Sequence, residues 1–120
     1  MENREFGKNL ENRTKRFAIS VIKLSASLPN TTEGKVLRNQ FTKSGTSIGA
    51  NYREANRSRS KADFYNKIKI CESESSETSY WLELIAELNW AENNKVNELI
   101  LKADEFLAIF TSIRKSLRKS

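Results

Sequence analysis

The chain has 120 residues, of which 38% are hydrophobic, and this suits one ordinary domain with a hydrophobic core. It carries a net charge of +6, no histidine and one cysteine, which exclude Ser-His-Asp and Cys-His catalysis as usually built, His-containing zinc sites and an internal disulfide. Four glycines and one proline are too few for the frequent turns of an all-β protein. We therefore expect a single domain of long helices over residues 1–120, and no enzyme.

No stretch of the sequence approaches the roughly 18–20 apolar residues that span a membrane. The first residues lack the apolar core of a signal peptide. A single cysteine fits a reducing compartment. The sequence therefore predicts a cytoplasmic protein with no membrane partner.

Hydrophobic side chains that recur in alternating steps of four and three residues predict four helices. The first stripe is Leu10, Thr14, Phe17, Val21, Leu24 and Leu28. Pro29 follows this stripe, so the first helix should span about residues 9–28. The second stripe is Leu37, Phe41, Ser44, Ile48, Asn51 and Ala55. Thr32 can cap the second helix, which should span about residues 33–56.

A polar segment, Arg57-Ser-Arg-Ser-Lys61, separates the second helix from the third, and Ser60 with Asp63 forms a variant capping box. The third stripe, which predicts a helix over about residues 61–89, is Phe64, Ile68, Cys71, Ser75, Thr78, Leu82 and Ile85. The fourth stripe, which predicts a helix over about residues 94–117, is Val96, Leu99, Ala103, Phe106, Phe110, Ile113 and Leu117. These helices and their short connections predict an all-α, left-handed, antiparallel up-down-up-down four-helix bundle.

Two features of the helices indicate contacts beyond those of a simple bundle. Gly45 and Gly49 lie on one side of the second helix, although glycine costs a helix roughly 1 kcal/mol relative to alanine. We expect another backbone to pass close to them, in a tight helix packing or a subunit contact, and a local kink is the alternative. Trp81, Leu84 and Leu88 widen the apolar face of the third helix beyond what a surface helix requires. A second copy of the chain would cover this face, and a thick monomer core is the alternative.

Charge is distributed unevenly along the chain. Residues 1–70 carry 15 basic and 6 acidic side chains, residues 71–105 carry 2 and 9, and residues 106–120 carry 4 and none. One basic cluster, around the loop between the second and third helices, is Arg53, Arg57, Arg59, Lys61 and Lys67. A second cluster, at the end of the fourth helix, is Arg114, Lys115, Arg118 and Lys119. Such clusters attract polyanions, although a solvated surface without a ligand is the alternative.

The direction of the helices decides which basic residues can act together. In an up-down bundle, the loop after the second helix and the end of the fourth helix can lie at the same end. We expect the start of the first helix, with Arg13, Lys15 and Arg16, at the other end.

Several patterns are typical of catalytic or metal sites but lack residues that those sites need. Gly45-Thr-Ser-Ile-Gly49 matches the Gly-x-Ser-x-Gly nucleophile motif, but it lies in a helical stripe and no histidine can activate Ser47. The glutamates of the third helix lack the spacing of a catalytic pair or a metal site. Cys71 lies on a core stripe, where we expect a buried hydrophobic residue. We therefore expect no catalytic residue, no metal and no cofactor.

Four segments resemble the signature of a bacterial family, the four helix bundle proteins, also called 23S rRNA-intervening-sequence proteins. They are Ser44-Gly-Thr-Ser-Ile-Gly-Ala-Asn51, Glu54-Ala55, Ser60-Lys-Ala-Asp-Phe64 and Glu77-Thr-Ser-Tyr-Trp-Leu82, within a resemblance over about residues 10–117. The resemblance implies a left-handed bundle similar to the accessory protein of diversity-generating retroelements, a basic homopentamer that binds nucleic acid and a reverse transcriptase. The family's molecular function is unknown, and the resemblance carries over no catalytic residue.

Two functions of different classes fit these observations. The first is a non-enzymatic, oligomeric nucleic-acid-binding or accessory protein, with RNA as the expected ligand and a homopentamer implied by the resemblance. Its phosphate contacts would come mainly from Arg53, Arg57, Arg59 and Lys61. The alternative is a protein–protein interaction scaffold with no nucleic-acid ligand, in which positive charge only aids solubility or steering.

Overall fold

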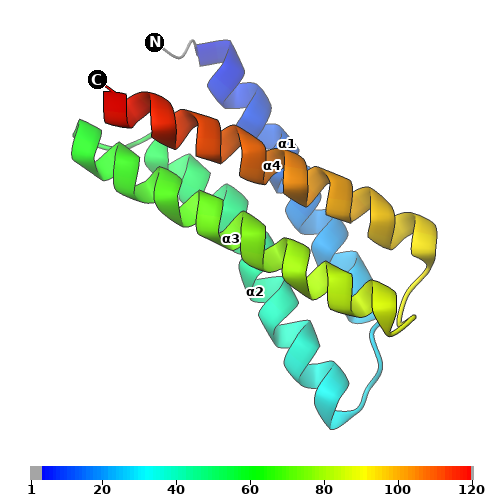
Figure 1. Ribbon diagram of the computed structural model, residues 1–120. Helices are drawn as coiled ribbons and strands as arrows, with labels where there is room; N and C mark the ends of the chain where they lie inside the picture. The colour runs from blue at the N-terminus through cyan, green and yellow to red at the C-terminus, as the bar shows by residue number, and fades with distance from the viewer. Residues whose placement is uncertain (1–3, 120) are drawn as a thin grey trace.

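The computed structural model describes residues 4–119, and these form four α-helices: α1 (Arg4–Ala26), α2 (Thr32–Ala55), α3 (Lys61–Glu87) and α4 (Asn93–Lys119). Consecutive helices run antiparallel, and each packs along the next one in the chain (Figure 1). The bundle measures 46 × 24 × 21 Å. The predicted all-α, antiparallel up-down-up-down bundle is confirmed.

Short polar side chains set the starts of α2 and α3. Ser60 caps α3 as predicted, since its hydroxyl accepts a hydrogen bond from the backbone N–H of Asp63 at 3.1 Å. The predicted cap of α2 was wrong by one residue: Thr31, not Thr32, accepts from the N–H of Gly34 at 3.0 Å. The first helix also begins earlier than predicted, because its first turn is exposed and carries no hydrophobic stripe.

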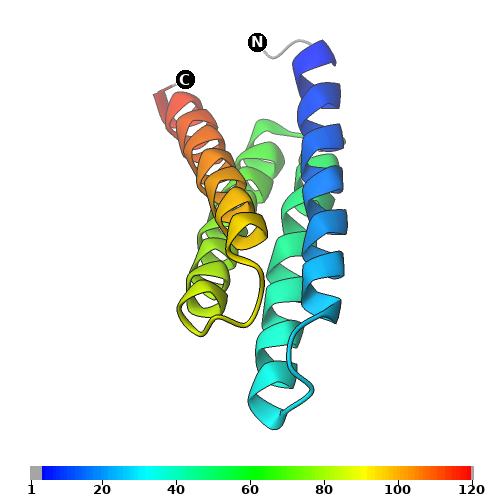
Figure 2. The same ribbon diagram turned by 90° about the vertical axis from the view of Figure 1, so that its right-hand side faces the viewer.

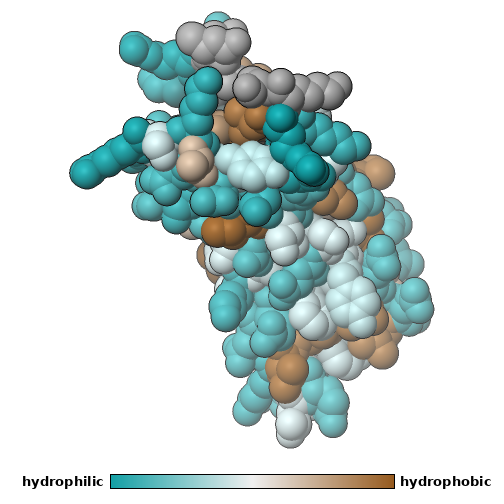
Figure 3. Space-filling view, turned by 60° about the vertical axis from the view of Figure 1, so that its left-hand side comes forward, coloured by the Kyte–Doolittle hydropathy of each residue, from teal (hydrophilic) through white to brown (hydrophobic). Residues whose placement is uncertain are grey.

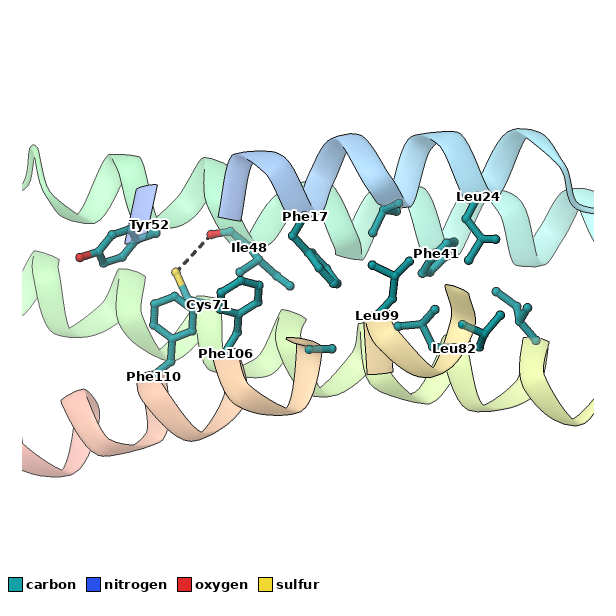
Figure 4. Close-up of a cluster of buried hydrophobic side chains, with 14 of the residues drawn as sticks. Phe17, Leu24, Phe41, Ile48, Tyr52, Cys71, Leu82, Leu99, Phe106 and Phe110 are labelled. Atoms are coloured by element: carbon teal, nitrogen blue, oxygen red, sulfur yellow. Dashed lines mark hydrogen bonds between the residues drawn. The ribbon is translucent and has the colours of Figure 1, made fainter. Parts of the chain in front are cut away.

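The four stripes meet in one continuous core. Its fully buried large side chains include Phe17, Phe41, Ile48, Tyr52, Ile68, Leu82, Phe106 and Phe110. Phe17 of α1 and Phe106 of α4 meet edge to face, with ring centroids 5.3 Å apart (Figure 4). Asn51 was predicted on the core stripe, but it is half-buried and its neighbour Tyr52 is buried instead.

The two stripe glycines allow α1 and α2 to approach closely. A Cβ atom at Gly45 would lie 2.7 Å from Cγ1 of Val21, and one at Gly49 would lie 3.0 Å from Oγ1 of Thr14. Both neighbours are buried residues of α1. The close contact therefore lies between two helices of one chain, and it is the tight helix packing expected at these glycines.

The connection between α1 and α2 is fixed by backbone packing and by one arginine. A Cβ atom at Gly34 would lie only 2.0 Å from the carbonyl oxygen of Pro29, so this position has no room for a side chain. Nη2 of Arg38 donates hydrogen bonds to the carbonyl oxygens of Leu28 and Pro29, at 2.9 and 3.3 Å. Arg38 thus satisfies carbonyl groups just beyond the end of α1.

The fourth side of the bundle is different, because α1 and α4 contact each other only sparingly. Figure 2 shows the two helices diverging toward the end of the molecule at which the chain termini lie. A groove runs between them, floored by buried residues that include Phe17, Leu24, Leu99 and Phe106.

Candidate nucleic-acid interface

Three separate segments of the chain meet at one end of the bundle: the start of α1, the α2–α3 loop and the end of α4 (Figure 1). Nδ2 of Asn56, just after α2, donates a hydrogen bond to Oε2 of Glu11 in α1 at 2.8 Å. The expectation that α1 begins at the other end was therefore wrong. A first and a third antiparallel helix both start at the end where the second one finishes, so α1 starts beside the α2–α3 loop.

This arrangement produces one basic surface, which we call the basic end. Its members are Arg4, Lys8, Arg53, Arg57, Arg59, Lys61, Lys67, Lys115 and Arg118. All of them are exposed except Lys67, which is half-buried. Figure 3 shows mostly hydrophilic residues at this end of the molecule, which is uppermost in that view.

Most of the arginines at the basic end are weakly held by the protein itself. Nε of Arg53 lies 3.9 Å from Oε1 of Glu11, and 58% of the Arg53 side chain is exposed. Nη1 of Arg57 reaches only the carbonyl oxygen of Arg53, at 3.4 Å. Among the described residues, no ion pair involves Arg57 or Arg59. Their charges are therefore available to phosphates.

Arg114 differs from the other predicted phosphate ligands, because it is already paired. Its Nε and Nη2 donate to the two carboxylate oxygens of Glu72 at 2.5 and 3.1 Å, and Thr111 donates a third hydrogen bond to that carboxylate. The hydrogen bond from Arg114 lowers the pKa of Glu72 below its ordinary value, although partial burial opposes it. Arg114 therefore joins α4 to α3 and is a poor candidate for binding a ligand.

The remaining residues of the predicted site occupy different surroundings. Lys115 and Arg118 lie at the basic end, and the side chain of Lys119 falls outside the described part of the structure.

The apolar face predicted on α3 is partly covered by the chain itself. Trp81 and Leu84 are partly buried and pack against the core, and Nε1 of Trp81 donates a hydrogen bond to Oε2 of Glu77 at 3.2 Å. Leu88, just after α3, is 49% exposed. Of this apolar face, Leu88 remains most open to a second copy.

The groups with reactive side chains are used in packing. Oγ of Ser47 donates to the carbonyl oxygen of Lys43 at 2.7 Å, inside α2. Cys71 is fully buried, with Sγ 3.6 Å from the carbonyl oxygen of Ile48, and burial raises the pKa of its thiol to about 12. Within residues 4–119, no three acidic or cysteine side chains gather closely enough to hold a metal ion. The four helices, as far as residues 4–119 describe them, contain no apolar stretch that could span a lipid bilayer.

The chain is thus a small antiparallel four-helix bundle protein with one basic end. The family model described as 23S rRNA-intervening sequence protein matches residues 9–112, and the chain belongs to this family. A crystal structure of a protein of unknown function from the S23 ribosomal protein family of Bacteroides thetaiotaomicron VPI-5482 is similar, with 35% identity and a TM-score of 0.80. The match covers 88% of this chain and 97% of that chain. No curated protein matches this chain significantly.

The site predicted from the sequence did not include two groups of basic residues. Arg4 and Lys8 join the basic end because of the direction of α1, which correct counting of helix directions would have revealed. A second group lines the α1–α4 groove: Arg13, Arg16, Lys23, Lys95 and Lys102. No signal in the sequence marks this second group, because cations beside a core stripe are common on any bundle.

Proposed function

We propose that the chain is a non-enzymatic, oligomeric cytoplasmic protein that binds nucleic acid, with RNA as the expected ligand, through its basic end. The observation that carries this proposal is the meeting of three basic segments, far apart in the sequence, on one exposed surface (Figure 1). Arginine and lysine side chains gathered in this way neutralise phosphates and release counterions. The name of the family refers to an intervening sequence of 23S rRNA, which agrees with an RNA ligand.

Phosphate contacts would come first from Arg53, Arg57, Arg59 and Lys61. These residues surround one loop, and neither Arg57 nor Arg59 has an ion-pair partner among the described residues. Lys67, Lys115 and Arg118 would extend the contact. No base-reading motif accompanies these residues, so the proposal concerns the nucleic-acid backbone and its shape.

Exposed apolar side chains support the oligomeric part of the proposal. Ile19 and Ile22 of α1 are 45% and 51% exposed, and Leu101 of α4 is 71% exposed. A second copy would remove such side chains from water. The family resemblance suggests a homopentamer, so sedimentation equilibrium should give a mass five times the 13.8 kDa of one chain. A mass of one chain at micromolar concentration would overturn this part.

The binding test compares two variants with the same change in net charge. Arg57→Glu/Arg59→Glu alters the basic end, and Lys35→Glu/Lys43→Glu alters exposed positions of α2 away from it. We expect the first variant to bind a structured RNA at least about tenfold more weakly at physiological salt, and the second to bind nearly as well as the unchanged protein. The salt slope should fall by about one for each phosphate that the variant no longer neutralises.

Equal losses of affinity in the two variants would show that net charge alone attracts the RNA, and the site assignment would be wrong. An unchanged protein that binds no RNA at physiological salt would contradict the proposed function. Saturable binding to a protein partner would then favour the scaffold alternative.

A further inference from the structure

The groove between α1 and α4 lies where this bundle is least closed, because these two helices pack against each other much less than consecutive helices do. It contains two adjoining hollows of about 370 and 230 Å³, and both are lined by Ser20 of α1 and Lys102 of α4. Each hollow is close to the size of a small-molecule pocket. The groove leads from the α3–α4 turn, where Ala91 and Glu92 line it, toward the end of the bundle that carries the basic end, where Arg13 lines it.

The floor of the groove is already sealed by the protein. Phe17 and Phe106 are 2% and 1% exposed, and Leu24 and Leu99 are 7% and 6% exposed. Figure 4 shows Phe17 and Phe106 approaching each other from α1 and α4. An apolar helix docked here would gain little further burial from these four side chains, because they are already almost fully buried.

The side chains that could bind a ligand in the groove lie mostly on its walls. Arg16 and Lys102 line the smaller hollow, whereas Lys23, Lys95 and Lys102 line the larger one. All four side chains are exposed, and none takes part in an ion pair among residues 4–119. Arg13, which also lines the smaller hollow, is different because its Nη2 lies 2.7 Å from Oε1 of Glu105.

Two carboxylates, Glu92 and Glu98, line the larger hollow and reduce its positive charge. Of the described residues, those that line the smaller hollow include no acidic one. Around the smaller hollow, Arg16 of α1 and Lys102 of α4 repel each other, and an anion between them would offset this repulsion. Anion binding should therefore be strongest around Arg16, Ser20 and Lys102.

We propose that this groove binds a single-stranded segment of the nucleic acid, with phosphates between Arg16 on α1 and Lys102 on α4. The proposal rests on the proposed function, because it specifies how one ligand would continue from the basic end. Residues seven apart on one helix, such as Arg16 and Lys23, lie about 10 Å apart along its axis, so the walls follow a strand over more than one phosphate. Hollows of about 370 and 230 Å³ can take in parts of a single strand but are too small to take in a duplex.

The test uses two probes and two variants of equal charge. The probes are a fluorescein-labelled oligouridylate, which is unstructured, and a blunt RNA hairpin of the same length. Arg16→Glu/Lys102→Glu alters the groove, and Lys35→Glu/Lys43→Glu is the control at exposed positions of α2. We expect the groove variant to bind the oligouridylate at least about tenfold more weakly than the control, and the hairpin as well as the control does. Thermal melting of both variants checks that they are folded.

Each other outcome contradicts a different part of the proposal. If the groove variant binds the oligouridylate as tightly as the control, the groove proposal is wrong while the basic end can still bind RNA. If its affinity for both probes falls equally, the groove does not select single strands, and the proposal is also wrong. If the unchanged protein binds neither probe, the proposed function fails, and the groove proposal fails with it. Arg16→Gln/Lys102→Gln repeats the comparison without introducing new acidic groups.

Discussion

Helix α1 packs against two neighbours in opposite ways. Toward α2 it meets glycines, and the helices approach so closely that a single methyl group at Gly45 would contact Val21 at 2.7 Å. Toward α4 it meets charged side chains of both signs, including the ion pair of Arg13 with Glu105, and a groove remains between the helices. Both interfaces contain a regular apolar stripe. Such a stripe thus brings helices together, whereas the size of the side chains beside it decides how closely they approach.

The largest predicted effect concerns the turn that brings α2 back along α1. Gly34→Ala should destabilise the protein by about 3 kcal/mol or more, since the new Cβ would overlap the carbonyl oxygen of Pro29 and force the backbone apart. Urea denaturation measures the change. Gly7→Ala is the control, because its nearest contact would be Nδ2 of Asn56 at an ordinary 3.4 Å. An equal loss of stability in both variants would contradict the steric explanation.

A smaller loss should follow from separating α1 and α2 at their closest approach. In Gly45→Ala the added methyl group crowds two methyl groups of the buried Val21, and overpacking of this kind typically costs about 1–3 kcal/mol. Alanine recovers about 1 kcal/mol in helix propensity. We expect a net destabilisation of about 1 kcal/mol by urea denaturation, and a smaller cost of the same change when it is made in a Val21→Ala background. A variant as stable as the parent would show that the approach is not tight.

The α3–α4 interface should respond to pH through Glu72. Its pKa is lowered by Arg114, so the ion pair stabilises the fold above the ordinary pKa of 4.5 and loses this effect as pH falls through the lower folded value. Glu72→Gln should therefore be less stable than the parent at neutral pH, and the difference should vanish in acid. Glu83→Gln, at an exposed position of α3, is the control. A difference that persists in acid would mean that packing, not charge, is responsible.

The smallest predicted effect is a gain of stability in the open groove. Arg16→Gln removes one of the facing cations and its like-charge pair with Arg13 three positions earlier on α1, and like-charge pairs on one helix cost about 0.2–0.5 kcal/mol. The melting temperature should rise slightly at low salt, and high salt should remove the difference by screening. A decrease at low salt would contradict a net repulsion between Arg16 and the cations around it.

The heptad stripes predicted the architecture well because the core of this bundle is built from them. Phe17, Val21, Phe41, Ile48 and Leu82 all lie on predicted stripes and are all fully or almost fully buried. Helix ends were less accurate, since Thr31 and Thr32 are equally good caps in sequence and only the backbone geometry separates them.

The candidate site was predicted less completely than the fold. Arg57 and Arg59 could be proposed from a local charge cluster, but their union with Lys8 depends on helix direction. The pairing of Arg114 with Glu72 joins residues 42 positions apart, and nothing in a single sequence reports such a contact. The groove exists because α1 and α4 do not pack closely against each other. The periodic spacing of hydrophobic residues does not reveal how closely two helices approach.

The burial of Cys71 makes the protein convenient for site-directed labelling. Its thiol is fully buried with a pKa of about 12, so maleimide reagents should leave it untouched at neutral pH. A cysteine introduced at Asn30, which is exposed in the α1–α2 turn, would carry a dye at the end of the bundle away from the basic end. Tags at the chain termini would instead lie beside the proposed RNA contacts and compete with the ligand that they are meant to report (Figure 1).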